Sequence, residues 1–308
     1  MFRNHKKLWI IVLIVVLIGV GAAMSQKDKD KDVKPITDGQ GQTADGNNTP
    51  GSTQKPAKEE TKISITEQVL IDEDGIKVTA KGYENDSIWG EGVKLLVENN
   101  SDKDVTVGCD ALIVNNYMIS DLFSSSVAAG KKANETLHFS SSDLEAAGIA
   151  PVGQIEIYFY FSNPKTYMIE KRLDPVTIKT SEFANMDTTP NDAGKELLNR
   201  DGVRIVGKYV DEKSFWGASI LLYVENKTGK KISVACDDVS INGFMVTGYF
   251  SSTLYDGKMA IDNITLLSGE LEKNGITSVD EVELKFRVRD SETYDVLFET
   301  DPIKFSTK

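Results

Sequence analysis

The chain carries one stretch of sequence twice. Residues 74–180 align with residues 201–307 at a constant offset of 127 without a gap, and 35 of the 107 aligned positions are identical. Matched landmarks are Trp89-Gly90 with Trp216-Gly217, Cys109-Asp110 with Cys236-Asp237, and Asp174-Pro175 with Asp301-Pro302. A period this long indicates a duplicated domain rather than a solenoid unit. The sequence therefore predicts two domains of one fold.

Apolar and polar residues alternate within each copy. Val93, Leu95 and Val97 fall on one face of an extended strand, and the second copy repeats the pattern. Turn signals such as Asn242-Gly243 separate these runs at short intervals. We therefore expect an all-β chain with two tandem immunoglobulin-like β-sandwich domains. One short helix is expected in each copy, near residues 141–147 and 268–274.

The N-terminus has the pattern of an export signal. Residues 1–7 are basic, and residues 8–24 are free of charge and largely aliphatic. A basic segment followed by an apolar one predicts an N-terminal helix that starts on the cytoplasmic side and leaves the remaining chain outside the membrane. Two outcomes stay open: a single-pass transmembrane anchor over 8–24, or a signal peptide cleaved near Gly21–Ala23, which would give a secreted protein. Either one predicts an extracytoplasmic location for the repeats.

The remaining chain divides by composition. Residues 25–62 have no aromatic side chain and predict a disordered linker, because they cannot bury enough apolar surface to offset the entropy of ordering. The first sandwich is expected over 63–181, an inter-domain linker over 182–198, and the second sandwich over 199–308. The net charge of −12 argues against nucleic acid as a partner.

A break in the alternation marks one strand of each copy. Cys109 falls on the apolar face with Val105 and Val107, whereas Leu112 and Val114 require the opposite parity. Such a phase change is typical of a β-bulge. We expect Asp110, and Asp237 in the second copy, to accept backbone N–H groups at the bulge. Cys109 and Cys236 are interpreted as buried thiols, and Asn115 and Asn242-Gly243 as turn residues.

The set of motifs resembles a known family. Trp-Gly, Leu-x-Val-Glu-Asn, Val-x-Cys-Asp and Asn-Gly-Phe-Met are similar to motifs in the immunoglobulin-like repeats of unknown function in Gram-positive cell-envelope proteins and lipoproteins. The resemblance covers residues of about 66–181 and 194–308. It implies an extracytoplasmic β-sandwich and brings no catalytic residues. No Cys stands directly after the apolar segment, which is a departure from the lipid-anchored members.

The sequence indicates no catalytic, cofactor-binding or metal-binding residues. Only His5 and His138 are present, and Thr265 replaces the second of these in the other copy, so histidine chemistry is not shared by the repeats. Trp89 and Trp216 are interpreted as core residues, with stacking on a ligand as the alternative. Tyr158 and Tyr160, which only the first copy has, are further candidate ligand contacts.

Three functions are compatible with these features. The favoured one is a non-enzymatic cell-envelope display or binding module for adhesion, scaffolding or recognition, with a cell-surface protein or wall polymer as partner and the membrane reached through the N-terminal helix. An extracytoplasmic sensor or accessory subunit of a membrane complex is the alternative. A hydrolase that uses carboxylates such as Glu98 and Glu225 is the second alternative.

Overall fold

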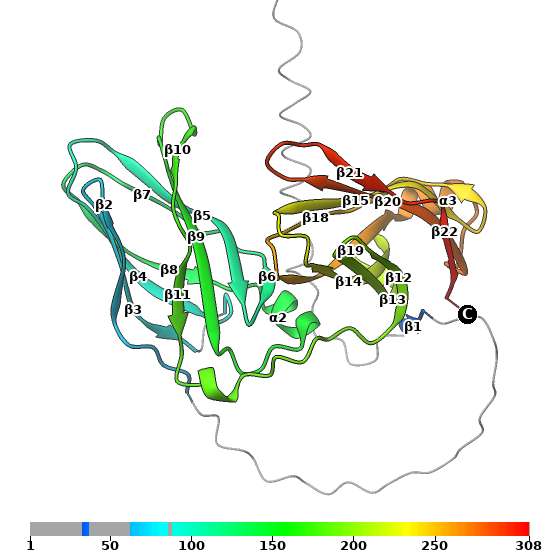
Figure 1. Ribbon diagram of the computed structural model, residues 1–308, viewed down its shortest axis with the longest axis horizontal. Helices are drawn as coiled ribbons and strands as arrows, with labels where there is room; N and C mark the ends of the chain where they lie inside the picture. The colour runs from blue at the N-terminus through cyan, green and yellow to red at the C-terminus, as the bar shows by residue number, and fades with distance from the viewer. Residues whose placement is uncertain (1–32, 37–61, 86–87, 308) are drawn as a thin grey trace, which may run out of the picture.

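The computed structural model describes residues 33–36, 62–85 and 88–307. The expected cytoplasmic tail and apolar segment, residues 1–24, lie outside this part of the chain, as does most of the expected linker. No helix within the described ranges is long and apolar enough to cross a membrane. Almost all regular elements of the described chain are strands (Figure 1), which confirms the all-β prediction.

The first repeat consists of two layers of strands. One layer has the order β2 (Gln68–Glu73), β3 (Ile76–Glu84), β4 (Gly92–Asn99), β8 (Lys132–His138). In the other layer the central pair is β5 (Val105–Val114) and β9 (Gln154–Ser162). This pair is flanked by β6 (Tyr117–Ile119), β7 (Ser124–Val127), β10 (Ile169–Arg172) and β11 (Val176–Lys179). The short helix α2 (Ser141–Ala147) connects β8 to β9.

The second repeat has the same order of strands. Its first layer contains β12 (Lys195–Arg200), β13 (Val203–Ser214), β14 (Gly217–Asn226) and β19 (Met259–Leu267), with β17 (Gly248–Tyr249) on β19. Its second layer contains β15 (Ile232–Ile241), β16 (Phe244–Met245), β18 (Ser251–Leu254), β20 (Glu281–Asp290), β21 (Val296–Glu299) and β22 (Ile303–Ser306). Helix α3 (Ser268–Lys273) occupies the place of α2.

Two boundaries differ from the sequence-based expectation. The segment 182–198 contains a 3-10 turn, η1 (Phe183–Asn185), and its last residues already belong to β12, which begins at Lys195. The expected disordered linker 25–62 contains a strand, β1 (Val33–Pro35), which pairs with β13 of the second repeat. The prediction of disorder is therefore wrong at this strand. Pairing with β13 orders β1, and β13 lies too far away in the sequence for the local composition to indicate it.

A buried asparagine closes the turn after the third strand of each repeat. Asn226 is fully buried, and its amide nitrogen donates to the carbonyl oxygens of Lys230 and Leu254 at 2.8 and 3.0 Å. Its amide oxygen accepts the N–H and the hydroxyl of Thr228. Asn99 makes the equivalent bonds in the first repeat. The buried amide thus uses both its nitrogen and its oxygen in hydrogen bonds that close the turn.

The phase change expected in the fourth strand is present in both repeats. The register between β5 and β9 shifts between Cys109 and Ala111, and that between β15 and β20 shifts between Asp237 and Ser240. Beyond the bulge, Asn242 has a positive φ of 52°, and its amide oxygen accepts the N–H groups of Asp280 and Glu281. The turn residue thus also fixes the start of β20.

Replacing Asn226 by alanine is expected to lower the free energy of unfolding by about 2–3 kcal/mol, because the turn loses the hydrogen bonds that this buried side chain makes to Lys230, Leu254 and Thr228. Chemical denaturation of the Asn226→Ala chain measures this loss. Asn199→Ala, at an exposed position of β12, is the control and should leave the unfolding midpoint unchanged. Equal stability of the two variants would contradict the role given to Asn226.

Candidate binding site

The two repeats meet in an apolar contact. Val206, Tyr223 and Met259 of the second repeat are buried and belong to the hydrophobic core of the first repeat. The Met259 N–H donates to the carbonyl oxygen of Asn116 at 3.0 Å, and β19 pairs with β6 at Tyr117. This one pair joins a sheet from each repeat into a continuous sheet. Burial of these side chains holds the repeats as one unit.

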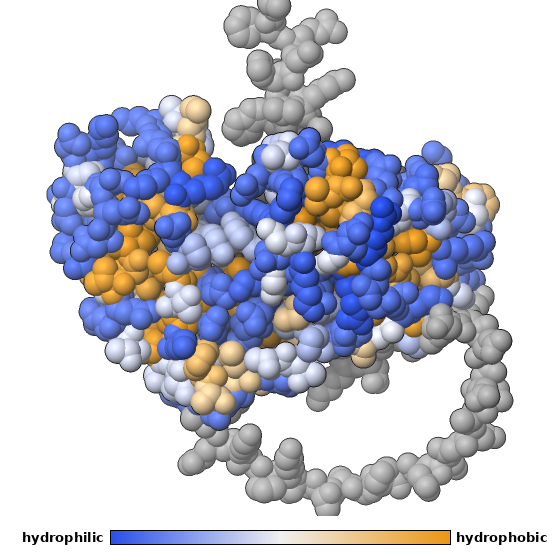
Figure 2. Space-filling model, in the orientation of Figure 1, coloured by the Kyte–Doolittle hydropathy of each residue, from blue (hydrophilic) through white to orange (hydrophobic). Residues whose placement is uncertain are grey.

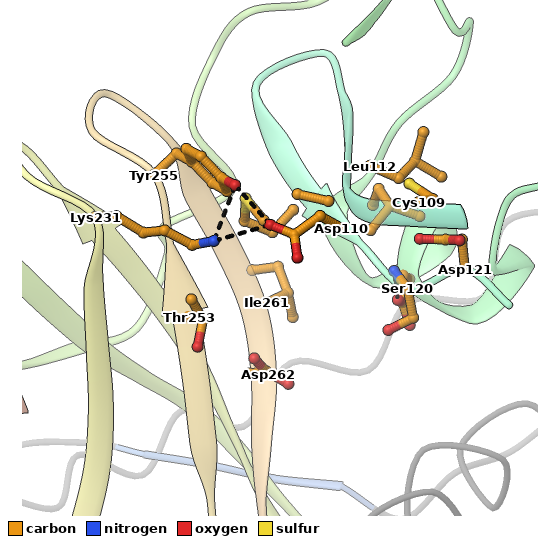
Figure 3. Close-up of a pocket in the computed structure, with 14 residues that line it drawn as sticks. Cys109, Asp110, Leu112, Ser120, Asp121, Lys231, Thr253, Tyr255, Ile261 and Asp262 are labelled. Carbon is orange, nitrogen blue, oxygen red and sulfur yellow. Dashed lines mark hydrogen bonds and ion pairs between the residues drawn. The ribbon is translucent and has the colours of Figure 1, made fainter. Parts of the chain in front are cut away.

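Polar groups from both repeats surround Asp110 (Figure 3). Its Oδ2 accepts the Lys231 ammonium at 3.3 Å and the Tyr255 hydroxyl at 3.2 Å. The Tyr158 ring lies 4.1 Å, between centroids, from the ring of Tyr255. Nearby, the Lys258 ammonium contacts Glu156 Oε1 at 2.6 Å, and both side chains are mostly buried. These contacts fix the register of the two repeats across the interface.

The chain between the repeats is also held at this interface. The Asn191 N–H donates to the Tyr117 hydroxyl at 2.7 Å, and its amide nitrogen donates to the carbonyl oxygen of Ala146. Asp192 pairs with Arg204 of β13 at 2.6 Å. The connection is therefore fastened to both repeats at Asn191 and Asp192.

A pocket of about 370 Å³ lies beside Asp110, with walls from both repeats (Figure 3). Cys109, Ser120 and Asp121 contribute from the first repeat, and Thr253 and Asp262 from the second. Four carboxylates line the space, because Asp110 and Asp143 join Asp121 and Asp262. Their charge favours a cationic or hydrogen-bond-donating group over an anion.

Burial perturbs several groups at the pocket. It raises the pKa of Asp262 to about 6, and the nearby Asp143 carboxylate adds to the effect. It raises the pKa of Asp121 as well. The pKa of the Cys109 thiol is also raised, first by burial and then by Asp121, so the sulfur is held protonated and is a poor nucleophile.

The repeated tryptophans lie at the tips of the second hairpin of each repeat, not in the cores. Trp89 is 71% exposed in the turn between β3 and β4, and Trp216 is 37% exposed between β13 and β14. The Trp216 and Phe215 rings pack edge to face, with their centroids 4.8 Å apart. The prediction of core packing is therefore wrong, because a tip that connects two neighbouring strands points beyond the layer that the strands cover.

A second pair of aromatic tips was not expected from the sequence. Tyr167, between β9 and β10, is 80% exposed at a φ of 58°, and Tyr294, between β20 and β21, is 75% exposed at a φ of 64°. The Tyr167 N–H donates to the carbonyl oxygen of Asn163, and the Tyr294 N–H to that of Asp290. We call these two turns the tyrosine hairpins. The matched Thr-Tyr pair at 166–167 and 293–294 was the available signal.

The tyrosine hairpins are held rigidly. The side-chain oxygen of Asn163 accepts the N–H groups of Lys165 and Thr166, and Asp290 accepts the equivalent pair in the second repeat. A bulky residue at positive φ costs on the order of 1 kcal/mol or more, so the loop must enforce it. Exposed apolar side chains follow each tyrosine, and these are Met168, Ile169, Val296 and Leu297.

The remaining expected site residues have structural surroundings. Cys109 and Cys236 are free thiols; the first is partly buried and the second is buried. Tyr160 is half-buried and packs over Gly108, where an added Cβ would approach its ring atoms. The expectation that Asp110 and Asp237 accept backbone N–H groups is wrong: Asp110 binds side chains of the second repeat, and Asp237 pairs with Arg287 at 2.7 Å. Exposed strand faces supply these cationic partners.

No family model and no curated protein matches the chain. Among solved structures, the YadV chaperone is 12% identical at a TM-score of 0.23, covering 75% of this chain and 99% of its own. A complex of the Salmonella enterica SafA pilin with the SafB chaperone is 12% identical at a TM-score of 0.20, covering 70% and 88%. A protein of unknown function from Porphyromonas gingivalis W83 is 11% identical at 0.18, covering 79% and 96%. Similarity at such low TM-scores supports no conclusion about function.

The raised pKa of Asp262 predicts a pH dependence of stability. The pKa of Asp262 is about 6 in the folded chain and near 3.8 in the unfolded chain, so between these pH values the folded state holds a proton that the unfolded state has released. Protonation of Asp262 therefore stabilises the fold at low pH, and this stabilisation is lost as the pH rises through about 6. Asp262→Asn should therefore raise the free energy of unfolding at pH 7 by roughly 1–2 kcal/mol and not at pH 4. Denaturation curves at both pH values, compared with those of the unchanged chain, measure the difference. A variant that is less stable than the unchanged chain at pH 7 would contradict the assignment.

Proposed function

We propose that the chain is a non-enzymatic binding module of the cell envelope, made of two immunoglobulin-like sandwiches. The observation that carries the proposal is the pair of tyrosine hairpins, which present Tyr167 and Tyr294 in the same backbone conformation from equivalent positions. Strained, exposed aromatic residues on rigid loops are typical of recognition sites. Tyrosine contributes a large contact area at low entropic cost.

The arrangement of the repeats supports simultaneous use of both tips. In the view of Figure 1, the β9–β10 hairpin points upward, and the β20–β21 hairpin lies along the upper side of the second repeat with its tip toward the first repeat. In the same orientation, Figure 2 shows apolar surface at the tip that leads into β10 and in the region of β21. Because the apolar joint around Tyr223 holds the repeats together, binding of one tip places the other at a fixed spacing. Fixed spacing raises avidity when a partner offers two matching sites.

The side chains beside the tyrosines favour a protein partner. Met168 and Ile169 are exposed beside Tyr167, and Val296 and Leu297 follow Tyr294. Aliphatic side chains gain from burial against apolar surface, which a protein offers more than a hydrated sugar polymer. The apolar N-terminal stretch, residues 8–24, supports placing the module outside the membrane, either anchored or released.

Tyr167→Asn and Tyr294→Asn test this proposal. Asparagine adopts positive φ more readily than tyrosine does, so the loops should keep their conformation while they lose the aromatic contact. The full chain, purified in detergent micelles, is titrated against isolated envelopes of cells that lack it. Each single variant should bind on the order of 10²-fold more weakly, because it keeps one contact of two. The double variant should show no saturable binding.

Phe244→Asn is the matched control, because Phe244 is also an exposed aromatic residue, 49% accessible, but lies on β16. It should bind as the unchanged chain does. Normal binding by the double tyrosine variant would contradict the proposal. Envelopes treated with protease should no longer bind the unchanged chain, and retained binding would shift the partner class from protein to wall polymer.

A further inference from the structure

Strand β13 of the second repeat has a long outer edge that its own repeat covers only in part. Along Val203–Gly207 this edge pairs with β12. The next stretch pairs with β1, which reaches it from the N-terminal side of the first repeat: Pro35 lies opposite Tyr209, and Lys34 opposite Val210. The two strands thus lie end to end along one edge, although more than 150 residues separate them in the sequence.

The residue after β1 fills a space in the core of the second repeat. Ile36 is 4% exposed and belongs to that core. A Cβ built on Gly207 would lie 2.8 Å from Ile36 Cδ1 and 3.1 Å from Leu197 Cδ1, so the slot exists because residue 207 is glycine. The Lys34 ammonium contacts Glu212 Oε1 at 3.0 Å. The edge therefore offers backbone N–H and C=O groups for strand pairing, an apolar slot and a carboxylate.

The first repeat fills the same place with its own incoming chain. Asn85, directly beyond β3, accepts the N–H of Ile63 at 2.7 Å and donates to its carbonyl oxygen at 2.8 Å. In the second repeat the corresponding incoming chain is drawn away, because Asn191 is bonded to Tyr117 and Ala146 of the first repeat. The joint between the repeats thus leaves the edge of β13 to another segment.

We propose that this edge is a strand-binding site for an extended peptide that carries a lysine two residues before a buried aliphatic residue. Its resident occupant is Val33–Ile36 of the same chain. Main-chain pairing to Lys208–Asp211 supplies affinity, and the Gly207 slot and Glu212 supply selectivity. The site is separate from the tyrosine hairpins and does not depend on their function.

A disulfide across the register tests the resident occupant in the full chain. With Pro35→Cys and Tyr209→Cys, mild oxidation should link the two residues within one chain, seen as a faster-moving monomer on a non-reducing gel. The native thiols do not compete, because burial raises the pKa of both Cys109 and Cys236. Pro35→Cys with Asp211→Cys, two residues out of register, is the control and should link at least about tenfold more slowly.

The slot is tested from both sides of the contact. In the chain with Pro35→Cys and Tyr209→Cys, a third substitution should abolish the disulfide. Ile36→Asp removes the aliphatic side chain that fills the slot, and Gly207→Val fills the slot itself. Ile36→Val should keep the disulfide. Equal rates in and out of register, or links formed only between two chains, would overturn the resident assignment.

A free peptide tests whether the edge is a binding site in its own right. The Ile36→Asp chain should unfold at a lower temperature than the unchanged chain, and a synthetic peptide of residues 31–38 at millimolar concentration should raise that temperature again. The same peptide with Ile36→Asp should have no effect, and the unchanged chain should respond less because its site is filled. No response of the Ile36→Asp chain to the first peptide would overturn the binding site.

Discussion

The burial of Tyr223, Val206 and Met259 of one repeat in the core of the other determines most of what is distinctive in this molecule. An aliphatic side chain such as Val206 or Met259 contributes about 1.5–3 kcal/mol when it is fully withdrawn from water. The joint holds the two repeats against each other, and the connecting chain is bonded to it at Asn191. It is also asymmetric, because different faces of the same fold meet.

An asymmetric contact between like units could in principle continue to a third unit. The sequence opposes this. Lys231, Tyr255 and Met259 of the second repeat correspond to Asp104, Ala128 and Lys132 in the first, so the face that accepts Asp110 is not duplicated. In a further head-to-tail contact the aspartate that replaces Lys231 would meet Asp237, and like charges would repel. The divergence of the copies therefore limits the joint to two repeats.

Local pattern predicted what local physics controls. The alternation of Val93, Leu95 and Val97, the bulge after Cys109 and the turn at Asn242 follow from residue-scale geometry, and each could be read from the chain. The sequence did not show which surface of the molecule packs against which other surface. Asp110 was interpreted through its own strand, but its two hydrogen-bond partners, Lys231 and Tyr255, come from the other repeat. The burial of Ile36 likewise depends on a contact between distant segments, whereas Trp89 is exposed because it lies at a hairpin tip.

The docking of β1 also has a mechanical consequence. A pull on the chain ahead of residue 33 acts first on the edge of β13, so the load enters through the second repeat and bypasses the first. If that strand detached, residues 37–62 would be added to the path, a contour length of roughly 90 Å at the extended rise per residue. The chain would then lengthen in one step while both sandwiches stayed folded, and the force would reach the first repeat only afterwards.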